Sequence, residues 1–177
     1  MRETLFQSRW LAVHRIDHWE FVGRPDSDSC VGILAITPEQ EIVLVEQFRI
    51  PVQNSVIELP SGLVGDEEEH RSESIAETAK RELLEETGFE ADNIEKLIVS
   101  PTSPGMSSEL MHLFLATGLT RVGPGGGVAS EDIITHIIPL KDLRPWINDR
   151  LSEGTTVDFK IHAALWAAQP FLSDYKS

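Results

Sequence analysis

Three glutamates, Glu82, Glu85 and Glu86, have the residue type and the spacing to do chemistry together. They stand at positions i, i+3 and i+4, so on a helix their carboxylates lie along one side. Like charges this close repel one another unless a positive group lies among them. Hard divalent cations, Mg2+ above all, are held by a few carboxylates together with water and substrate phosphate. The alternative for such a pattern is a solvated acidic face.

The position of these glutamates relative to the apolar residues favours the cation site. At roughly 100° per residue, Ile75, Ala79 and Leu83 form the apolar arc of this stretch. Glu86 projects between the directions of Ile75 and Ala79, and Glu82 lies just beside the arc. A carboxylate aimed at the core must be paired or must coordinate a cation, because burying it bare is strongly unfavourable.

The helix that positions these acids has a recognisable start and end. Ser74 and Glu77 form a capping box, in which each side chain takes an unpaired amide of the first turn. Gly88 supplies the left-handed residue that closes a helix, and no helix breaker lies between these ends. We therefore predict a helix of about three and a half turns that begins at Ser74 and closes at Gly88.

The segment around this helix resembles the Nudix box, the signature of hydrolases that cut nucleoside diphosphates linked to another moiety. The match consists of Glu73, seven intervening residues, and then Arg81-Glu82-Leu83-x-Glu85-Glu86-x-Gly88-Phe89. It departs from the family pattern at one point, because ten residues separate Gly62 from Glu73 where the family has five. We interpret the extra residues, within 65–72, as a surface extension of the loop before the helix.

This resemblance implies a fold and a division of the chain. We expect an α/β fold, a Nudix-type α/β/α sandwich with a mixed central sheet and a small N-terminal β segment. Residues 1–28 would form the N-terminal β segment, used in dimerisation and in binding the substrate base, and residues 29–177 the Nudix hydrolase domain. Within the domain we predict strands at 31–36, 41–48, 94–100, 109–117 and 133–140, and helices at 143–151 and 157–168, the last capped by Thr155 or Thr156.

The family resemblance also assigns roles within the box. Glu85 would bridge metal ions or orient the attacking water, and Glu73 and Arg81 would form the pair that steadies the helix. The expected cofactor is Mg2+, with Mn2+ as the alternative. The metal ligands would be Glu82, Glu85, Glu86 and the backbone carbonyl of Ser61, which stands in a Glu-Leu-Pro-Ser-Gly segment similar to one of the family.

A narrower resemblance, to the ADP-ribose pyrophosphatase branch, implies substrate contacts. In that branch a Trp-Glu pair, here Trp19 and Glu20, stacks on and hydrogen-bonds the adenine, in an N-terminal segment that crosses to a partner subunit. Arg24 stands where such enzymes carry a basic residue, and Met106, in a Ser-Pro-Gly loop, would line the pocket of the terminal ribose. From the residues alone, Trp10 and Trp19 are better explained as core residues and Met106 as a loop residue.

Arg49 is the candidate phosphate ligand, because a planar guanidinium binds phosphate oxygens bidentately. It stands in a Gln-Phe-Arg segment that resembles the family's Q-x-R motif, and its alternative role is a surface ion pair. Residues 122–129 are too glycine-rich to hold one conformation without a partner, so we predict a mobile active-site loop or a flexible linker. Glu131, in preference to Asp132, is the predicted general base, although both could be exposed acids at a strand start.

Composition limits the partners of this chain. Its 177 residues suit one domain, and a formal charge of −14 would repel nucleic acid and anionic membranes, so we expect neither partner. Cys30, the single cysteine, excludes an internal disulfide. No run approaches the ~18 apolar residues of a membrane span, and no basic segment followed by an apolar stretch opens the sequence, so we expect a cytoplasmic protein. The N-terminal segment indicates a homodimer.

These observations predict Mg2+-dependent hydrolysis of the diphosphate of ADP-ribose to AMP and ribose 5-phosphate. Two alternatives stay open. One is a pyrophosphatase for another nucleoside diphosphate sugar, such as GDP-mannose, because the ligands contact only the diphosphate. The other is a catalytically silent domain that senses a nucleotide, against which the three box glutamates argue.

Overall fold

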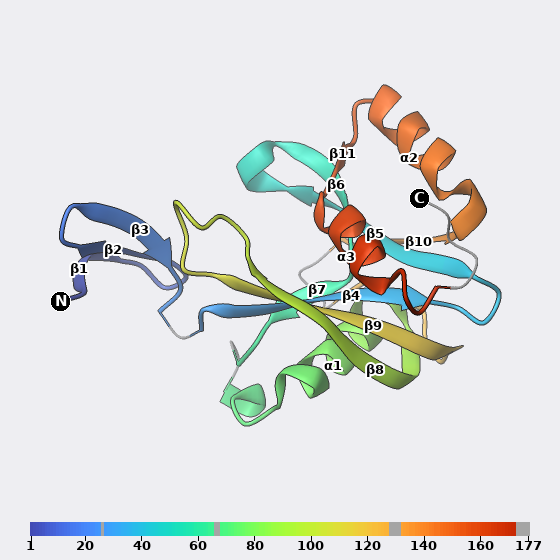
Figure 1. Cartoon of the computed structure of the whole chain (residues 1–177), viewed down its shortest axis with the longest axis horizontal. Helices are drawn as coiled ribbons and strands as arrows, with labels where there is room; N and C mark the ends of the chain where they lie inside the picture. Colours follow the sequence, from blue (N-terminus) through green and yellow to red (C-terminus); the bar gives the residue numbers. More distant parts are fainter. Residues whose placement is uncertain (26, 66–67, 128–131, 173–177) are drawn as a thin grey trace.

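The computed structural model describes residues 1–25, 27–65, 68–127 and 132–172. Over these residues the chain forms a central eight-stranded sheet, a separate three-stranded sheet near the N-terminus, and helices on both faces of the central sheet (Figure 1). The predicted α/β/α sandwich with a small N-terminal β segment is therefore confirmed.

The central sheet is mixed, as predicted. Its strands are β4 (Ser29–Ile36), β5 (Glu41–Arg49), β6 (Asn54–Glu58), β7 (Ser61–Leu63), β8 (Phe89–Pro101), β9 (Leu110–Arg121), β10 (Ile134–Pro139) and β11 (Thr156–Val157). The main order is β11-β6-β5-β4-β9-β8, with β10 paired to β5 and β7 paired to β4. The pairs β4–β9 and β6–β11 are parallel, and the other pairs are antiparallel.

Helices cover both faces of this sheet and close two cores. They are α1 (Ile75–Thr87), α2 (Leu143–Ser152) and α3 (Lys160–Ala168), with short 3-10 helices η1 (Ile50–Val52), η2 (Glu68–His70) and η3 (Leu140–Asp142). Side chains alternate along β4, so Val31 and Ile33 pack with α1. Their neighbours Leu34 and Ile36 pack on the other face with α2 and α3. Figure 1 shows α1 and α3 on opposite sides of the sheet.

The box helix α1 begins and ends where the sequence predicts. The Ser74 hydroxyl accepts a hydrogen bond from the Glu77 amide, and the Glu77 carboxylate accepts one from the Ser74 amide. Gly88 closes the helix in the left-handed conformation, with φ 75°. Leu83 is fully buried and Glu86 is 3% exposed, so the apolar side of the helix also carries an acid.

The last helix begins later than the sequence predicts. The apolar pattern predicted a start at Val157 after a threonine cap, but α3 starts at Lys160 and has no side-chain cap. Thr156 and Val157 form β11, which pairs with β6 at the sheet edge. The Asp158 carboxylate, between this strand and α3, accepts a hydrogen bond from the Lys160 amide at 2.8 Å.

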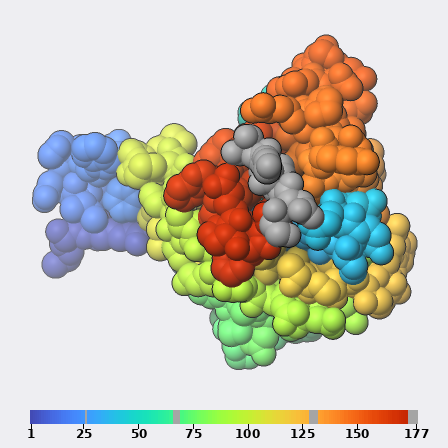
Figure 2. All heavy atoms as spheres, turned by 45° about the vertical axis from the view of Figure 1, so that its right-hand side comes forward, coloured from blue at the N-terminus to red at the C-terminus, as the bar shows by residue number. Residues whose placement is uncertain are grey.

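The N-terminal segment is a three-stranded antiparallel sheet of β1 (Glu3–Gln7), β2 (Ala12–Ile16) and β3 (Trp19–Gly23). The small N-terminal β segment predicted from the sequence is thus formed by three strands. The sheet projects from the body of the molecule (Figure 2) and meets it where the Val22 amide donates to the Met106 carbonyl at 2.8 Å. Trp10 and Trp19 are 55% and 53% exposed, so their interpretation as core residues is wrong.

The described part of the glycine-rich stretch is bound to the end of α1. The Gly126 and Gly127 amides donate to the carbonyls of Glu86 and Glu85 at 2.8 and 3.0 Å. Over residues 122–127 the glycine-rich stretch therefore has a partner, the end of the helix, and its mobility stays a prediction. Residues 128–129 of this stretch and the candidate base Glu131 lie outside the described residues.

Candidate active site

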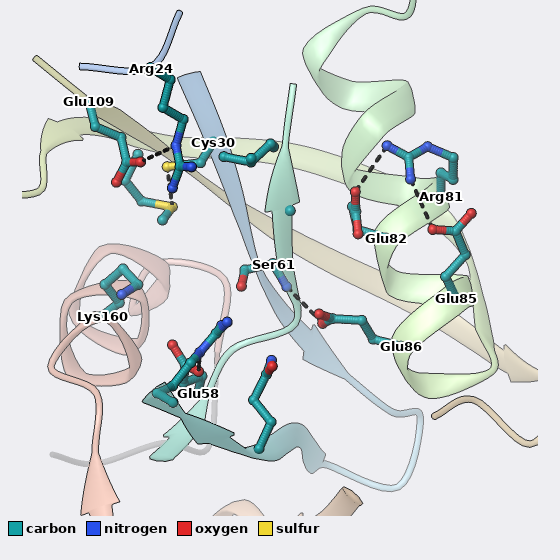
Figure 3. Close-up of a pocket in the computed structure, with 15 residues that line it drawn as sticks. Arg24, Cys30, Glu58, Ser61, Arg81, Glu82, Glu85, Glu86, Glu109 and Lys160 are labelled. Carbon is teal, nitrogen blue, oxygen red and sulfur yellow. Dashed lines mark hydrogen bonds and ion pairs between the residues drawn. The ribbon is translucent and has the colours of Figure 1, made fainter. Parts of the chain in front are cut away.

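A cavity of about 410 Å3 lies between the box helix and the start of α3 (Figure 3). Its volume is that of a small-molecule site. Strands β4 to β7 and β9 form its floor and sides. The lining residues are Arg24, Cys30, Gln47, Arg49, Glu58, Ser61, Gly62, Leu63, Arg81, Glu82, Glu85, Glu86, Glu109, Met111 and Lys160.

Carboxylates of the box helix form one wall of the cavity. The Glu86 side chain is almost fully buried, and its Oε2 accepts a hydrogen bond from the Ser61 backbone amide at 2.9 Å. Glu82 lies against Gly62 so closely that a Cβ at Gly62 would be 2.0 Å from the Glu82 Cδ. The fold of α1 onto β7 thus brings two acids to the backbone of the predicted ligand Ser61.

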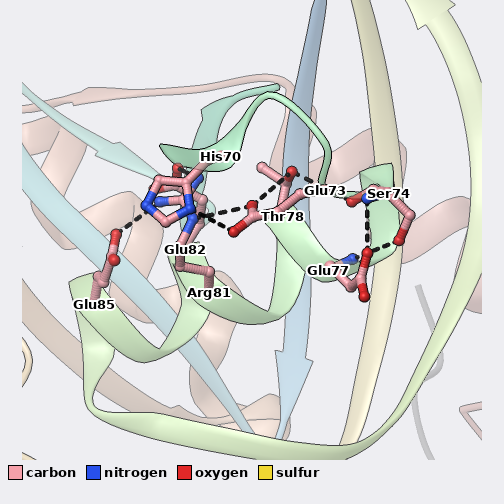
Figure 4. Close-up of polar contacts among 8 residues, drawn as sticks. All are labelled: His70, Glu73, Ser74, Glu77, Thr78, Arg81, Glu82 and Glu85. Carbon is pink, nitrogen blue, oxygen red and sulfur yellow. Dashed lines mark hydrogen bonds and ion pairs between the residues drawn. The ribbon is translucent and has the colours of Figure 1, made fainter. Parts of the chain in front are cut away.

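Arg81 binds three acids beside this wall (Figure 4). Its Nε donates to Glu73 Oε2 at 3.2 Å and its Nη1 to Glu85 Oε2 at 2.9 Å. Its Nη2 lies 2.9 Å from Glu82 Oε1, an ion pair without hydrogen-bond alignment. Burial lowers the pKa of Arg81, but the charges of Glu82, Glu85 and Glu73 and the hydrogen bond to Glu73 raise the pKa above its ordinary value. The guanidinium therefore stays charged and offsets repulsion among the acids.

Glu73 anchors this network at the start of the helix. It accepts hydrogen bonds from Arg81 and from Thr78 Oγ1, the latter at 3.3 Å, and its Oε1 lies 2.6 Å from His70 Nδ1. Burial raises the pKa of the Glu73 carboxyl, but Arg81 and His70 lower it to below its ordinary value. The expected Glu73–Arg81 pair is present. The longer loop supplies His70 to it, so this loop contacts the box and is not only a surface extension.

The facing wall of the cavity carries three cations, each paired with a carboxylate. The Arg49 Nε donates to Glu58 Oε2 at 2.5 Å, and the Arg24 Nε donates to Glu109 Oε2 at 3.0 Å. Lys160 joins them from the start of α3, where it pairs with an aspartate. Arg49 is therefore in an ion pair and also lines the cavity, and phosphate binding by Arg49 stays a prediction. Three cations beside an acidic wall suit a ligand whose phosphates contact both.

Sequence analysis missed several residues of this cavity. Glu58 opens the Glu-Leu-Pro-Ser-Gly segment and could have been found from that motif. Lys160 carried no such signal, because its place in the cavity depends on the pairing of β11 with β6. Cys30 also lines the cavity. Burial raises the pKa of the Cys30 thiol to about 12, so this cysteine is an uncharged, unreactive lining group at neutral pH.

Three predicted substrate contacts, Trp19, Glu20 and Met106, are not among the residues that line the cavity in the described part of the chain. The Trp19 Nε1 donates to the Gly105 carbonyl at 3.3 Å. Glu20 is paired with Arg15 at 2.7 Å. The fold brings Trp19 and the 103–108 loop together at the junction of the two sheets. Contact of these residues with substrate stays a prediction.

The oxygen atoms around Ser61 fit a hard divalent cation. Within the described residues, no three His, Cys, Asp or Glu side chains already converge as a complete metal site. Glu82 and Glu86 instead flank the backbone at Ser61 and Gly62, and Mg2+ commonly completes such a partial set with water and substrate phosphate. The lack of a side chain at Gly62 leaves the space that the Glu82 carboxylate fills. The residues present therefore fit Mg2+ or Mn2+.

Replacing Gly62 by alanine is expected to lower kcat by at least ~10-fold, because catalytic geometry tolerates little displacement. The new Cβ would overlap the Glu82 side chain and push its carboxylate away from Ser61. Stability should change little, because the displaced group is the end of a side chain. Steady-state kinetics and thermal unfolding measure the two effects. An unchanged kcat would contradict the placement of Glu82 against Gly62.

A buried, acid-bearing helix on a mixed sheet, facing guanidinium groups across a small cavity, defines a class of hydrolases that act on phosphate anhydrides. The NUDIX domain family model matches residues 26–154. The chain therefore belongs to the Nudix family. Among the described residues, no helix has the length and apolar character needed to cross a membrane.

The chain is similar in sequence to several named proteins. The chain is 37% identical over 129 residues to the methanol dehydrogenase activator of Bacillus methanolicus, covering 72% of this chain and 67% of that protein. It is 41% identical over 92 residues to the ADP-ribose pyrophosphatase of Bacillus subtilis, covering 51% of this chain and only 46% of that protein. It is 33% identical over 139 residues to the GDP-mannose pyrophosphatase of Pectobacterium atrosepticum, covering 72% and 69%.

One solved structure, described as an ADP compounds hydrolase, superposes with a TM-score of 0.73 at 22% identity. The alignment covers 97% of this chain and 91% of that one. At this identity the match supports the fold alone, and it extends over the N-terminal sheet as well as the domain.

Proposed function

We propose that this protein hydrolyses the diphosphate of ADP-ribose, in a Mg2+-dependent reaction that releases AMP and ribose 5-phosphate. One observation carries the proposal: a single cavity has the box acids on one wall and Arg24, Arg49 and Lys160 on the other. A diphosphate between two riboses needs a cation between its charges and the acids, and donors for its remaining oxygens. The similarity to an ADP-ribose pyrophosphatase supports this substrate.

Different residues of the cavity would bind the metal ion and the phosphate oxygens. Ser61, Glu82 and Glu86 would hold a divalent ion, which when bound neutralises charge on the diphosphate and templates its oxygens. Arg49 and Lys160 would bind oxygens that the ion leaves free. Attack by water forms one phosphorus–oxygen bond while the bond from that phosphorus to the bridging oxygen breaks. Two phosphate monoesters result, and the proton from water passes to a base.

A GDP-mannose or related substrate is the second candidate. The acids and cations of the cavity contact the diphosphate and not the base or the sugar, so the cavity by itself accepts any such compound. The match to a GDP-mannose pyrophosphatase favours this alternative specifically. A silent nucleotide-sensing domain is disfavoured, because the three box acids and their arginine partner are all in place.

The test is a turnover screen of the full chain with ADP-ribose, GDP-mannose and UDP-glucose, each with Mg2+, with Mn2+ and with a chelator. Chromatography resolves the products. We expect the highest kcat/KM with ADP-ribose, equal amounts of AMP and ribose 5-phosphate, and no turnover with the chelator. Preference for GDP-mannose would move the assignment to the second candidate, and no turnover of any compound would reject the hydrolase.

We also propose a homodimer formed through the N-terminal sheet. This small sheet exposes the apolar residues Leu5, Phe6, Trp10, Leu11, Ile16 and Trp19. Large exposed apolar surfaces are typical of association sites, and a partner's Trp19 and Glu20 would then be free to reach the substrate base. The occupant we infer is a second copy, because so small a sheet buries little apolar surface alone.

The double substitution of Phe6 and Trp10 by serine is expected to weaken dimerisation at least ~10-fold, about 1.4 kcal/mol. KM for ADP-ribose should rise, because the exchanged segment would carry base contacts. Light scattering over a concentration series and steady-state kinetics measure the two effects. Trp166→Ser, which alters an exposed tryptophan on α3, is the matched control. A wild-type protein that is monomeric at micromolar concentration, together with an unchanged KM in the double variant, would reject the exchange.

The general base is proposed to come from the acids that follow the glycine-rich stretch. Glu131 remains our first choice, and Asp132, which is exposed, the second. Loss of a general base lowers kcat by about 100- to 10,000-fold, so Glu131→Gln should show this loss with little change in KM. A kcat within about threefold of wild type, well short of that loss, would reject Glu131. A loss confined to Asp132→Asn would move the role by one residue, and no loss in either would leave Glu85 or another box carboxylate as the base.

A further inference from the structure

The end of the box helix is held by backbone groups of the glycine-rich segment 122–127. Carbonyl groups of the last turn of a helix have no partner within the helix. Here the Gly127 amide donates to the Glu85 carbonyl at 3.0 Å, and the Gly126 amide donates to the Glu86 carbonyl at 2.8 Å. The Thr135 hydroxyl also donates to the Glu86 carbonyl, at 3.3 Å. The carbonyls thus bound belong to two of the acids assigned to the metal site.

The contact between this segment and the helix leaves no room for a side chain at two positions. A Cβ at Gly125 would lie 2.4 Å from the carbonyl carbon of Thr87, and a Cβ at Gly88 would lie 2.2 Å from the Gly123 carbonyl oxygen. Both obstacles are backbone atoms, which cannot turn aside as a side chain can. Gly125 also has φ +71°, a conformation that other residues rarely adopt.

Segment 122–127 also forms hydrogen bonds with Arg121 and with the Gly88 carbonyl. The Arg121 Nε donates to the Gly123 carbonyl and its Nη2 to the Pro124 carbonyl, both at 3.3 Å. The Gly88 carbonyl accepts the amides of Val122 and Gly123 at 2.9 and 3.1 Å. The segment therefore binds both the helix and the strand that precedes it, which is more than a connecting loop requires.

We infer that residues 122–127 act as a backbone clamp that positions the metal-binding carboxylates, with Gly125 as its central positioning residue. The clamp fixes the backbone of Glu85 and Glu86, and so fixes where their side chains begin. Its amides also oppose the negative end of the helix dipole beside these acids. No clamp residue is among the described residues that line the cavity. This inference rests on the proposed function only in taking the box acids as the metal site.

The test compares Gly125→Ala with Gly154→Ala in the full chain. Gly154 also has a left-handed φ, +91°, but a Cβ there would meet nothing within 4 Å, so it reproduces the backbone strain without the clash. Mg2+ affinity is measured by calorimetry without substrate, and kcat and KM are measured with ADP-ribose. We expect Gly125→Ala to weaken Mg2+ binding and kcat about 10- to 100-fold, as loss of groups that orient metal ligands does. The KM of Gly125→Ala should stay near that of the wild type. The Mg2+ affinity, kcat and KM of Gly154→Ala should all stay near wild-type values.

Hydrogen exchange keeps the test decisive if Gly125→Ala fails to fold, and Thr135→Val tests a further donor to the Glu86 carbonyl, from β10. The substitution removes one donor to the Glu86 carbonyl and changes little else, so Mg2+ affinity should fall about two- to tenfold, the worth of one hydrogen bond. The Gly126 and Gly127 amides should also be protected from hydrogen exchange in the wild-type protein. Wild-type Mg2+ affinity in folded Gly125→Ala would overturn the clamp, and so would rapid exchange of both amides in the wild-type protein, a measurement that needs no variant.

The outcomes separate the clamp from the proposed substrate. A wild-type protein that binds Mg2+ but hydrolyses no nucleoside diphosphate sugar would reject the substrate assignment alone, because the affinity comparison between variants still stands. A wild-type protein that binds neither Mg2+ nor Mn2+ would reject the metal site and the clamp together, since no metal ligands would remain to be positioned.

Discussion

Replacing Glu86 by glutamine is expected to lower kcat by about two to four powers of ten, roughly 3 to 5 kcal/mol of transition-state stabilisation. The side chain is buried beside Ser61, so its charge acts on a bound cation with little screening. Glu82→Gln should behave alike, because Glu82 lies against Gly62 next to the same backbone. Glutamine keeps the size of the side chain and an oxygen acceptor, so the fold should survive.

Turnover with Mg2+ measures the expected loss of kcat, and unfolding by denaturant measures whether the fold survives. The charge-matched control is Glu90→Gln, which removes an exposed acid from β8 outside the cavity and should keep wild-type turnover. The free energy of unfolding without metal should hold or rise in Glu86→Gln, because one like charge is removed from the wall, whereas Glu82→Gln also loses the ion pair with Arg81. Near-wild-type turnover in both variants would eliminate the metal-site assignment.

Replacing Arg81 by alanine is expected to destabilise the fold by about 3 kcal/mol, because it leaves partly buried acids without their counter-charge. Glu73, Glu82 and Glu85 all lie within 3.2 Å of the guanidinium, whose side chain is 18% exposed. Turnover should fall as well, since Glu82 and Glu85 would repel one another. Arg81→Lys keeps the charge but not the three-way contact, so an intermediate loss is expected.

The pH dependence of unfolding tests the origin of that loss. The pKa of Glu73 is lowered in the folded protein, so its contribution to stability is present above the unfolded pKa and is lost as pH falls through the folded pKa. The stability difference between wild type and Arg81→Ala should therefore be largest at neutral pH and shrink below about pH 4.5, near the ordinary pKa of a glutamate. A difference that stays constant from pH 7 to pH 3 would show lost packing and not lost charge pairing.

The box helix shows how much local chemistry alone specifies. Its capping box, its closing glycine and its spacing of acids all depend on residues within four positions of one another. The same holds for the alternation of β4, which fills two cores and so indicates a covered sheet. The burial of Glu86 also followed from its direction on the helix, between those of Ile75 and Ala79.

The amino-acid sequence by itself thus determined the family, the box helix, most strands and the three box acids of the cavity, because these depend on short-range spacing. Tertiary structure alone decided the rest. Lys160 reaches the cavity only because β11 pairs with β6, and the glycine-rich segment gains one conformation only because it lies against the end of α1. Trp19 faces outward because the sheet that carries it has no core to cover it. Each of these outcomes depends on contacts between residues far apart in the chain, and periodicity within a short window carries no information about them.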